Sequence, residues 1–268
     1  MNDAQISFRP ALGGSIPAAW IVEPKNPAPE RPLVAVHGIS RDAEGMARLL
    51  APMAARTGRT VIAPHFDKPN WPRFQLAYCK NRADLALLRL LGSLKKDGII
   101  PPGIPDLAGF SGGAQFAHRF AWLYPDRVGR LCLSSAGWWT FPETARWPMG
   151  MGATRRQPLF QFWLSANLPA FLDRQIVVRV GALDNIPDSN TRRDPELDAR
   201  QGQDRVTRAT LWAGALRDAA LTHRIKPDIN FAVLPGCGHS VADCVTKGGL
   251  DADFLNAVEQ NNPERRIA

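Results

Sequence analysis

The sequence of 268 residues has no uninterrupted apolar stretch of about 20 residues, the length that a helix needs to span a bilayer core. We therefore expect no membrane span. Its first ten residues lack a basic segment followed by an apolar run, so they are not typical of a secretory signal. Internal repeats and low-complexity tracts are also lacking, so the sequence does not indicate a repeat architecture.

Cysteine is scarce: the chain has Cys79, Cys132, Cys237 and Cys244. These are too few for a disulfide scaffold at this length, and we expect a cytoplasmic protein. Cys237 and Cys244 bracket His239 and could form a disulfide, a metal site with that histidine, or two free thiols. No second Cys/His pair stands nearby to complete a metal site, and free thiols are commonest in a protein without a signal segment. We expect no metal and no cofactor.

The net charge of +8 and the isoelectric point of about 9.8 would suit a nucleic-acid or anionic-lipid partner. However, the basic residues are scattered, and the arginine pairs at 155–156, 192–193 and 265–266 stand far apart. No nucleic-acid-binding motif is present. We therefore expect a generally basic surface, a small-molecule substrate and no nucleic-acid partner, while the oligomeric state stays open.

Apolar runs that are typical of strands alternate with helical patterns along most of the chain. A hairpin is predicted around Gly13-Gly14, between 6–9 and 18–22. Further strands are predicted at 33–36, 60–63, 106–110, 128–133, 175–180 and 229–234, and helices at 44–57, 81–96, 112–124, 204–220 and 251–260, with Asn81 as an N-cap. This order predicts an α/β fold with a mostly parallel central sheet and helices on both faces.

The segment 138–173 interrupts the alternation, because it contains aromatic residues and prolines but no strand pattern. It follows a predicted strand end, so we expect it to form a short cap over the site rather than a second domain. The core would then comprise 1–137 and 174–268. The aromatics could instead simply pack this insertion onto the core, although pockets are also mainly apolar and aromatic.

The stretch Gly109-Phe-Ser-Gly-Gly113 fits the pattern G-x-S-x-G. A serine in this pattern sits on a sharp turn between a strand and a helix, with its hydroxyl exposed and glycines two positions away to avoid a clash. The predicted strand before Ser111 and helix after it supply that context. A phosphate-binding glycine loop is the rival interpretation, but the stretch lacks both the G-K-[ST] and the G-x-G-x-x-G spacing.

A serine nucleophile needs a base, and the chain has five histidines to consider. His239 follows the last predicted strand in a glycine loop and is the expected base, with His65 as the alternative. We expect His118 to be structural because it lies inside the helix after Ser111. His223 is expected to be exposed, and His37 belongs to a His-Gly turn.

The carboxylate that orients such a base should lie between the serine and the histidine in chain order. Asp184 follows the predicted strand 175–180 and faces the site end of the sheet. Asp188, Asp194 and Asp198 lie further out in a polar loop, where solvated or capping roles are more common. Asp184 is therefore the expected orienting acid.

Two backbone N–H groups are expected to bind the oxyanion that forms during acyl transfer. One belongs to Gly112, directly after the serine, and the other to Ile39, after the strand 33–36. His37-Gly38 could alternatively be no more than a tight turn. The residues expected to line the substrate pocket are Ser40, Phe110, Trp138, Trp139 and Trp163.

The motifs Val36-His-Gly-Ile39, Gly109-Phe-Ser-Gly-Gly113, Gly181-Ala-Leu-Asp184 and Gly236-Cys-Gly-His239 occur in the order seen in the α/β-hydrolase superfamily, which the chain resembles over about residues 30 to 260. The resemblance implies Ser111 as nucleophile, His239 as base, Asp184 as orienter and 138–173 as a cap. His-Gly is followed here by Ile-Ser, unlike the Gly-Gly of HGGG-type esterases.

Together these residues predict a serine hydrolase that cleaves a carboxylic ester of an apolar or aromatic small substrate through an acyl-enzyme on Ser111. A thioesterase, lactonase, amidase or C–C bond hydrolase would use the same residues. A non-catalytic ligand-binding protein on this fold is the alternative of a different class. A serine disfavours dehalogenase chemistry, which uses an aspartate as nucleophile.

Overall fold

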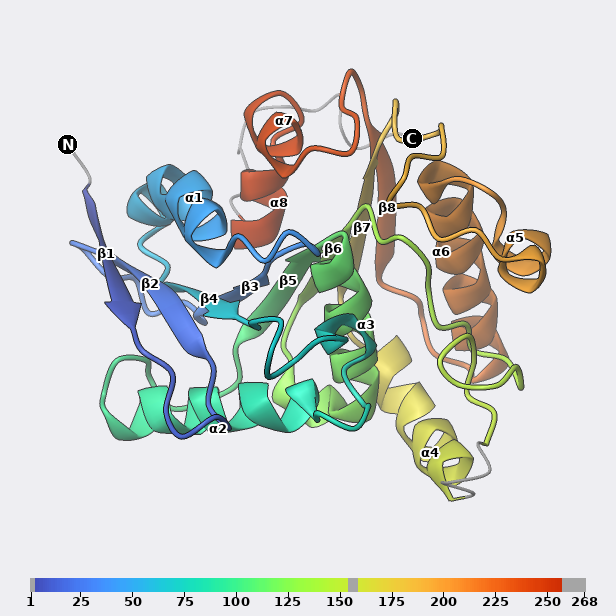
Figure 1. Cartoon of the computed structure of the whole chain (residues 1–268), viewed down its shortest axis with the longest axis horizontal. Coiled ribbons are helices and arrows are strands. Elements are labelled where there is room, and N and C mark those ends of the chain that lie inside the picture. Colours follow the sequence, from blue (N-terminus) through green and yellow to red (C-terminus); the bar gives the residue numbers. More distant parts are fainter. Residues whose placement is uncertain (1–2, 154–158, 257–268) are drawn as a thin grey trace.

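The computed structural model describes residues 3–153 and 159–256 and contains one eight-stranded sheet in the order β1-β2-β4-β3-β5-β6-β7-β8 (Figure 1). The strands are β1 (Ala4–Arg9), β2 (Ala18–Pro24), β3 (Leu33–Val36), β4 (Val61–His65), β5 (Asp106–Phe110), β6 (Leu131–Ser134), β7 (Ile176–Gly181) and β8 (Ile229–Leu234). β1 and β2 pair antiparallel, β2 pairs antiparallel with β4, and every other pairing is parallel. The predicted hairpin and mostly parallel sheet are confirmed.

Helices cover both faces of the sheet, as the alternating pattern predicted (Figure 1). The helices are α1 (Ala43–Thr57), α2 (Ala83–Lys96), α3 (Gly112–Leu123), α4 (Phe160–Leu172), α5 (Pro195–Gln201), α6 (Arg205–Thr222), α7 (Val241–Thr246) and α8 (Leu250–Leu255), with short 3-10 turns η1 (Phe74–Leu76) and η2 (Pro125–Arg127). Buried side chains of α1, α7 and α8 pack on one face of the sheet. Those of α2, α3, α4 and α6 pack on the other.

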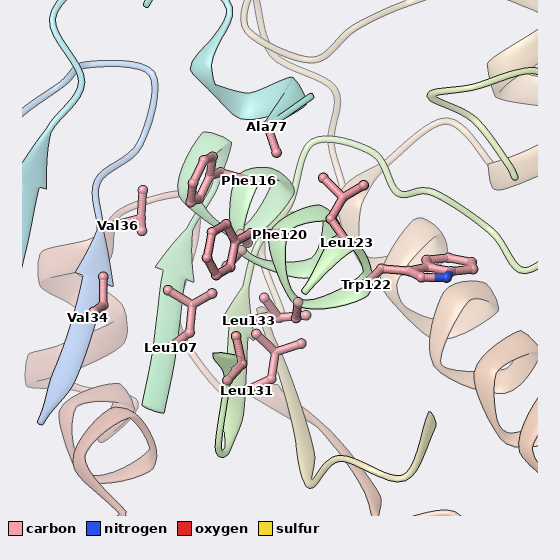
Figure 2. Close-up of a cluster of buried hydrophobic side chains, with 14 of the residues drawn as sticks. Val34, Val36, Ala77, Leu107, Phe116, Phe120, Trp122, Leu123, Leu131 and Leu133 are labelled. Carbon is pink, nitrogen blue, oxygen red and sulfur yellow. The ribbon is translucent and has the colours of Figure 1, made fainter. Parts of the chain in front are cut away.

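Side-chain alternation along the strands separates the two apolar cores. In β3, Val34 and Val36 face the core that includes α3, whereas Leu33 and Ala35 face the core that includes α1. Figure 2 shows the first core, where residues of β3, β5 and β6 meet Phe116 and Phe120 of α3. Because both faces are covered, the parallel strands are apolar in both directions.

The predicted boundaries were wrong in two places. β6 begins at Leu131 rather than at 128, because Pro125–Arg127 first form the 3-10 turn η2. Asn81 does not cap α2: the N-cap residue is Arg82, in the left-handed region at φ 44°, and the Asn81 side chain instead donates to the Asn70 carbonyl at 2.7 Å. The predicted closing helix is described as α8 up to Leu255, and 257–268 lie outside the described residues.

The segment predicted as a cap contributes to the main core. Helix α4 buries Phe160, Leu164, Leu168 and Phe171 in the same cluster as α3. Trp122 of α3 stacks on Phe171 with ring centroids 5.1 Å apart. The α4 half of the segment is therefore a helix of the layer that covers the sheet. Among the described residues, no helix combines the length and the apolar character needed to cross a membrane.

Candidate functional site

Ser111 lies at the sharp turn from β5 into α3, with φ 54° and ψ −114°. A side chain in this region of backbone space costs about 1–3 kcal/mol, and the surrounding structure must impose it. Glycines allow the close packing around the turn. A Cβ on Gly109 would lie 2.3 Å from the Gly113 carbonyl carbon, and one on Gly113 would lie 2.0 Å from the Val36 oxygen. The turn at Ser111 therefore has the strained strand-to-helix geometry that the pattern G-x-S-x-G predicts.

Ser111, His239 and Asp184 form a continuous hydrogen-bonded chain across the carboxyl ends of three parallel strands. The Ser111 Oγ lies 3.0 Å from His239 Nε2, and His239 Nδ1 lies 2.7 Å from Asp184 Oδ2. Ser111 follows β5, Asp184 follows β7 and His239 follows β8. Asp184 and Ser111 are buried, and the His239 side chain is 18% exposed, so solvent reaches the edge of the imidazole.

The backbone N–H groups of Ile39 and Gly112 lie beside Ser111. A Cβ on Gly112 would lie 3.2 Å from the Ile39 nitrogen, so the two loops are in close contact. Gly112 is the first residue of α3, where a helix has no internal acceptor for the N–H group. Within 3–153 and 159–256, neither N–H group has a hydrogen-bond acceptor. Both are therefore available to an oxygen atom next to Ser111.

His37 holds the loop that presents Ile39. Its Nδ1 lies 2.7 Å from the Gly38 carbonyl oxygen, and its Nε2 accepts from the Phe66 N–H at 3.1 Å. Burial lowers the pKa of His37 to about 4, so the ring is neutral and Nδ1–H donates. Gly38 C=O and Ile39 N–H belong to one planar peptide unit, so this bond orients the N–H group. The sequence indicated only a turn here.

The other three histidines lie outside the hydrogen-bonded chain. His65 ends β4 and packs edge-on against His37, with ring centroids 6.1 Å apart. His118 is buried in α3, bonded to Ala114 O and to the Thr140 N–H, and desolvation by burial lowers its pKa well below the ordinary value. His223 caps the carboxyl end of α6 and is exposed. The structure therefore joins His239, and not His65, to Ser111.

Asp184 has a second buried partner that the sequence did not predict. The Asp184 Oδ1 accepts from Arg205 Nη1 at 2.9 Å, and Arg205 Nη2 donates to Asp188 at 2.9 Å. Arg205 is the first residue of α6, and the sequence analysis gave it no role. Asp194 does cap α5, as expected for this loop. Asp198 instead pairs with the buried Arg208 at 2.7 Å.

The five residues predicted to line a pocket have different surroundings. Ser40 is exposed on the loop after β3, and the Phe110 ring lies 5.2 Å from the His239 ring. Trp139 is buried and stacks on Trp212 at 4.1 Å, so it belongs to the core. Trp163 packs against Tyr124, at the end of α3 opposite Ser111, about 18 Å away at 1.5 Å per residue. Trp139 and Trp163 are therefore not brought to Ser111.

Trp138 lies on the loop after β6 and has two arginines over its ring. The Gly137 backbone before it approaches Gln115, whose N–H bonds the Ser111 carbonyl at 3.1 Å. The guanidinium carbons of Arg119 and Arg192 lie 4.2 and 5.0 Å from the Trp138 ring centre. Arg119 is buried without a carboxylate partner among the described residues, and burial with the nearby Arg192 charge lowers its pKa to about 9.

Large apolar side chains are exposed on the loops that carry Ile39 and Asp184. Ile39 follows β3 and is 47% exposed, while Leu183 and Ile186 flank Asp184 and are 63% and 75% exposed. We call these three residues the apolar rim. Exposed apolar groups concentrated around a polar site favour the binding of an apolar partner or ligand.

Cys237 and Cys244 are free thiols rather than a disulfide. Both are buried, and burial together with the neighbouring Cys237 raises the pKa of Cys244 to about 12. Within 3–153 and 159–256, no group of three or more His, Cys, Asp or Glu side chains is arranged to hold a metal ion.

No protein-family model matches the sequence, and neither does any curated protein. Solved structures do match over nearly the whole chain. A poly(aspartic acid) hydrolase-1 from Sphingomonas sp. KT-1 superposes with a TM-score of 0.77 at 22% identity, covering 96% of this chain and 98% of that one. A poly(3-hydroxybutyrate) depolymerase from Bordetella parapertussis gives 0.74 at 22% identity, covering 94% of each chain. An S-formylglutathione hydrolase from Staphylococcus aureus gives 0.53 at 15% identity, covering 96% and 94%.

At these identities the likeness establishes the fold. Together with the strand order and the helices on both faces, it shows that the chain has the α/β-hydrolase fold. The carboxyl ends of the parallel strands, where ligands bind in such open sheets, carry Ser111, Asp184 and His239.

Proposed function

We propose that this chain is a serine hydrolase that cleaves a carboxylic ester with an apolar or aromatic acyl group. One observation carries the proposal: Ser111, on a strained turn, is hydrogen-bonded to His239 at 3.0 Å, and His239 to Asp184 at 2.7 Å. A serine hydroxyl is a poor nucleophile at neutral pH, and this chain supplies both a base and a group that orients the base.

The acylation step uses these residues in turn. His239 Nε2 removes the hydroxyl proton as the Ser111 Oγ attacks the acyl carbon, and Asp184 stabilises the imidazolium that results. The N–H groups of Ile39 and Gly112 donate to the oxyanion of the tetrahedral intermediate. The intermediate collapses to an acyl-enzyme when His239 Nε2–H protonates the leaving alcohol.

The deacylation step repeats the same chemistry with water. His239 removes a proton from a water molecule, whose oxygen attacks the acyl carbon of the Ser111 ester. The same two N–H groups hold the second oxyanion, and His239 then returns the proton to the Ser111 Oγ as the carboxylic acid leaves. No metal or cofactor is required in either step.

The surroundings of Ser111 support an apolar acyl group. The apolar rim would contact such a group on the loops after β3 and β7, and Trp138 would contact it on the loop after β6. In this proposal the cap reduces to the part of the segment before α4, with Trp138 as a wall of the pocket. Pockets lined by apolar and aromatic groups suit apolar substrates.

An acyl group that ends in a carboxylate is the second candidate substrate. The observation that favours it is the pair of guanidinium groups over Trp138, one of them without a carboxylate partner among the described residues. Arg192 is 45% exposed in its side chain and could donate to a carboxylate that enters the pocket. A substrate of this kind would also agree with the name of the poly(aspartic acid) hydrolase.

A panel of p-nitrophenyl esters tests the proposal: acetate, butyrate, octanoate, benzoate and hemisuccinate, with a matching butyryl thioester and anilide. We expect ester hydrolysis with kcat/KM rising from acetate to octanoate or benzoate. Preference for hemisuccinate, lost in Arg192→Gln, would select the second candidate. Faster cleavage of the butyryl thioester or anilide than of the butyrate ester would show that the chain is a thioesterase or an amidase instead.

Ser111→Ala is the matched control, because it removes only the hydroxyl oxygen. Hydrolysis that persists unchanged in this variant would contradict the proposed nucleophile. A folded wild-type protein that cleaves no member of the panel, but binds the products, would favour the non-catalytic alternative.

A further inference from the structure

The Asp184 carboxylate is shared between an imidazole and a buried arginine. Its Oδ2 faces His239 Nδ1 at 2.7 Å, and its Oδ1 accepts from Arg205 Nη1 at 2.9 Å. The side chains of Asp184 and Arg205 are 1% and 2% exposed. The hydrogen bond between His239 and Asp184 Oδ2 does not itself require a cation at Asp184 Oδ1. The buried Arg205 must therefore have some other role.

The same guanidinium reaches a second carboxylate. Arg205 Nη2 donates to Asp188 Oδ1 at 2.9 Å, and Arg205 Nη1 lies 3.3 Å from Asp188 Oδ2. Burial acts to raise the pKa of Asp188, but hydrogen bonds from Arg205 and Thr191 outweigh it and hold the pKa well below its ordinary value. Asp188 is therefore a stable anion at neutral pH. Asp184, Arg205 and Asp188 form a bridge that we call the acid bridge.

The charges of the acid bridge match the charge that develops on His239. Two carboxylates and one guanidinium leave one net negative charge, which an imidazolium on His239 neutralises. If Asp188 were absent, Arg205 would cancel the charge of Asp184, and the imidazolium would face no net negative charge. If Arg205 were absent, Asp184 would lose the donor that fixes its second oxygen, and two anions would face the imidazole.

We infer that Arg205 and Asp188 are positioning residues for the proposed reaction: Arg205 aligns the Asp184 carboxylate on His239, and Asp188 offsets the Arg205 charge so that Asp184 can stabilise the imidazolium. This inference rests on the proposed function. It assigns Asp188, which the sequence places in a polar loop, to the hydrogen-bond network of the site.

Other charged or titratable groups near the acid bridge come from the neighbouring elements. Arg208 lies one turn further along α6 and is paired with Asp198 of α5 at 2.7 Å. Cys244 of α7 is close enough for Asp184 to contribute to its raised pKa, and it is neutral at the pH values of interest. Asp198 also pairs with the half-exposed Arg193 at 2.9 Å, so these three residues together add one positive charge. They are the same in the wild type and in every variant below, so differences between the variants report the charges of the acid bridge.

The two positioning residues have opposite charges, so their removal shifts the pH profile in opposite directions. Asp188→Asn removes a negative charge, which disfavours the imidazolium and moves the acid limb of kcat/KM to lower pH. Arg205→Met removes a positive charge, which favours the imidazolium and moves the acid limb to higher pH. Each shift is expected to be about 0.5–1 pH unit, the size for charges several ångströms apart near a protein surface.

The kcat values distinguish the alignment of the Asp184 carboxylate from the effect of the Arg205 charge. Arg205→Met is expected to lower kcat about 10²-fold, because Asp184 loses the donor that fixes its orientation, with KM changed less than about threefold. Arg205→Lys keeps the charge but not the two-pronged donor. We expect it to restore the wild-type position of the acid limb and only part of kcat.

The experiment is a set of pH–rate profiles on the best ester of the panel for wild type, Asp188→Asn, Arg205→Met and Arg205→Lys, with thermal unfolding of each variant. Arg59→Met is the matched control, because Arg59 forms a comparably buried pair with Asp106 at 2.7 Å, at the other end of the strands. It should lower the melting temperature without moving the acid limb.

Shifts of the two acid limbs in opposite directions are the expected result. Absent shifts, or shifts in one direction for both charge changes, would overturn the inference. If Arg205→Met does not fold, the other two variants still test the inference: the acid limb should move to lower pH in Asp188→Asn and stay in place in Arg205→Lys. A wild-type protein that is inactive on the panel, or whose activity survives Ser111→Ala, would instead contradict the proposed function.

Discussion

A buried arginine–aspartate pair lies at each end of the parallel strands. The two pairs differ in how many of their polar atoms have hydrogen-bond partners. At the amino ends, Arg59 donates to Asp106 and to the backbone carbonyls of Arg31 and Leu255, and the Arg130 N–H bonds the other Asp106 oxygen. At the carboxyl ends, Arg205 has an Nε without a partner among the described residues.

The two ends differ in how completely their buried polar groups are hydrogen-bonded and in how much backbone strain they hold. The amino-end pair closes its hydrogen bonds on the backbone, which is the arrangement that buried charges need for stability. The carboxyl end instead holds a serine at φ 54°, two N–H groups that have no acceptor in the described part of the chain, and a carboxylate divided between two partners. Unused donors and local strain are typical of a site that acts on a ligand.

The largest expected effect is at the carboxyl end. His239→Ala should lower kcat for the best ester about 10³–10⁴-fold, because the base that accepts the Ser111 proton is removed. The measurement is the steady-state rate at pH 7–8. His65→Ala is the control and should keep the wild-type rate within about threefold. Retained activity in His239→Ala together with lost activity in His65→Ala would reverse the assignment of the base.

The second expected effect is at the amino end. Arg59→Met should lower the free energy of unfolding by about 3–5 kcal/mol, because it leaves the buried Asp106 carboxylate without its ion pair. Urea unfolding measures this value. The kcat of the folded variant should stay within about threefold of wild type. A large loss of kcat in a folded variant would remove the contrast between the two ends.

The third expected effect is a pH dependence of stability at the carboxyl end. Burial lowers the pKa of His37 to about 4, so the unfolded chain binds a proton below pH 6.5 and the folded chain does not. Stability from this residue is present above pH 6.5 and is lost as the pH falls towards 4, a change of about 3 kcal/mol.

Unfolding of wild type and His37→Gln at pH 7 and pH 4.5 measures this dependence. The wild type should lose more stability on acidification than the variant does. His118, whose pKa is also lowered, contributes in the same direction to both proteins. His223→Gln is the exposed control and should behave like wild type. Equal losses in wild type and His37→Gln would contradict a neutral buried His37.

The smallest expected effect concerns the apolar rim. Ile186→Ser should lower kcat/KM for the octanoate ester about 3–10-fold and leave the acetate ester unchanged, because only a long acyl chain would contact this side chain. Leu221→Ser is the matched control, since Leu221 is equally apolar, 63% exposed, and lies at the far end of α6. An equal loss for both esters would show that the rim does not contact the acyl chain.

Much of the fold follows from the sequence, because the parallel strands are short apolar runs separated by helical patterns. The strained turn at Ser111 was also predictable, since glycines at positions 109 and 113 are required by contacts of 2.0–2.3 Å. The positions of Asp184 and His239 directly after predicted strands, with the acid between serine and histidine in chain order, selected residues that the structure joins by hydrogen bonds.

The sequence could not distinguish the surroundings of the three tryptophans, for a physical reason. A core and an apolar pocket both bury aromatic side chains, so composition alone could not separate Trp138, under two guanidinium groups, from Trp139 in the core and Trp163 packed against Tyr124. Arg205 was missed because an arginine at the start of an amphipathic helix is normally solvated, and its burial depends on the loop that carries Asp188.

Covalent labelling with a fluorophosphonate probe is the most direct test of the claim that Ser111 is an activated nucleophile. Peptide mass spectrometry should find one adduct, on Ser111, in the wild-type protein, and labelling should be at least about 100-fold slower in His239→Ala. Absence of an adduct on Ser111 in a folded protein that hydrolyses esters, or an adduct on another serine at the same rate in both proteins, would contradict the account.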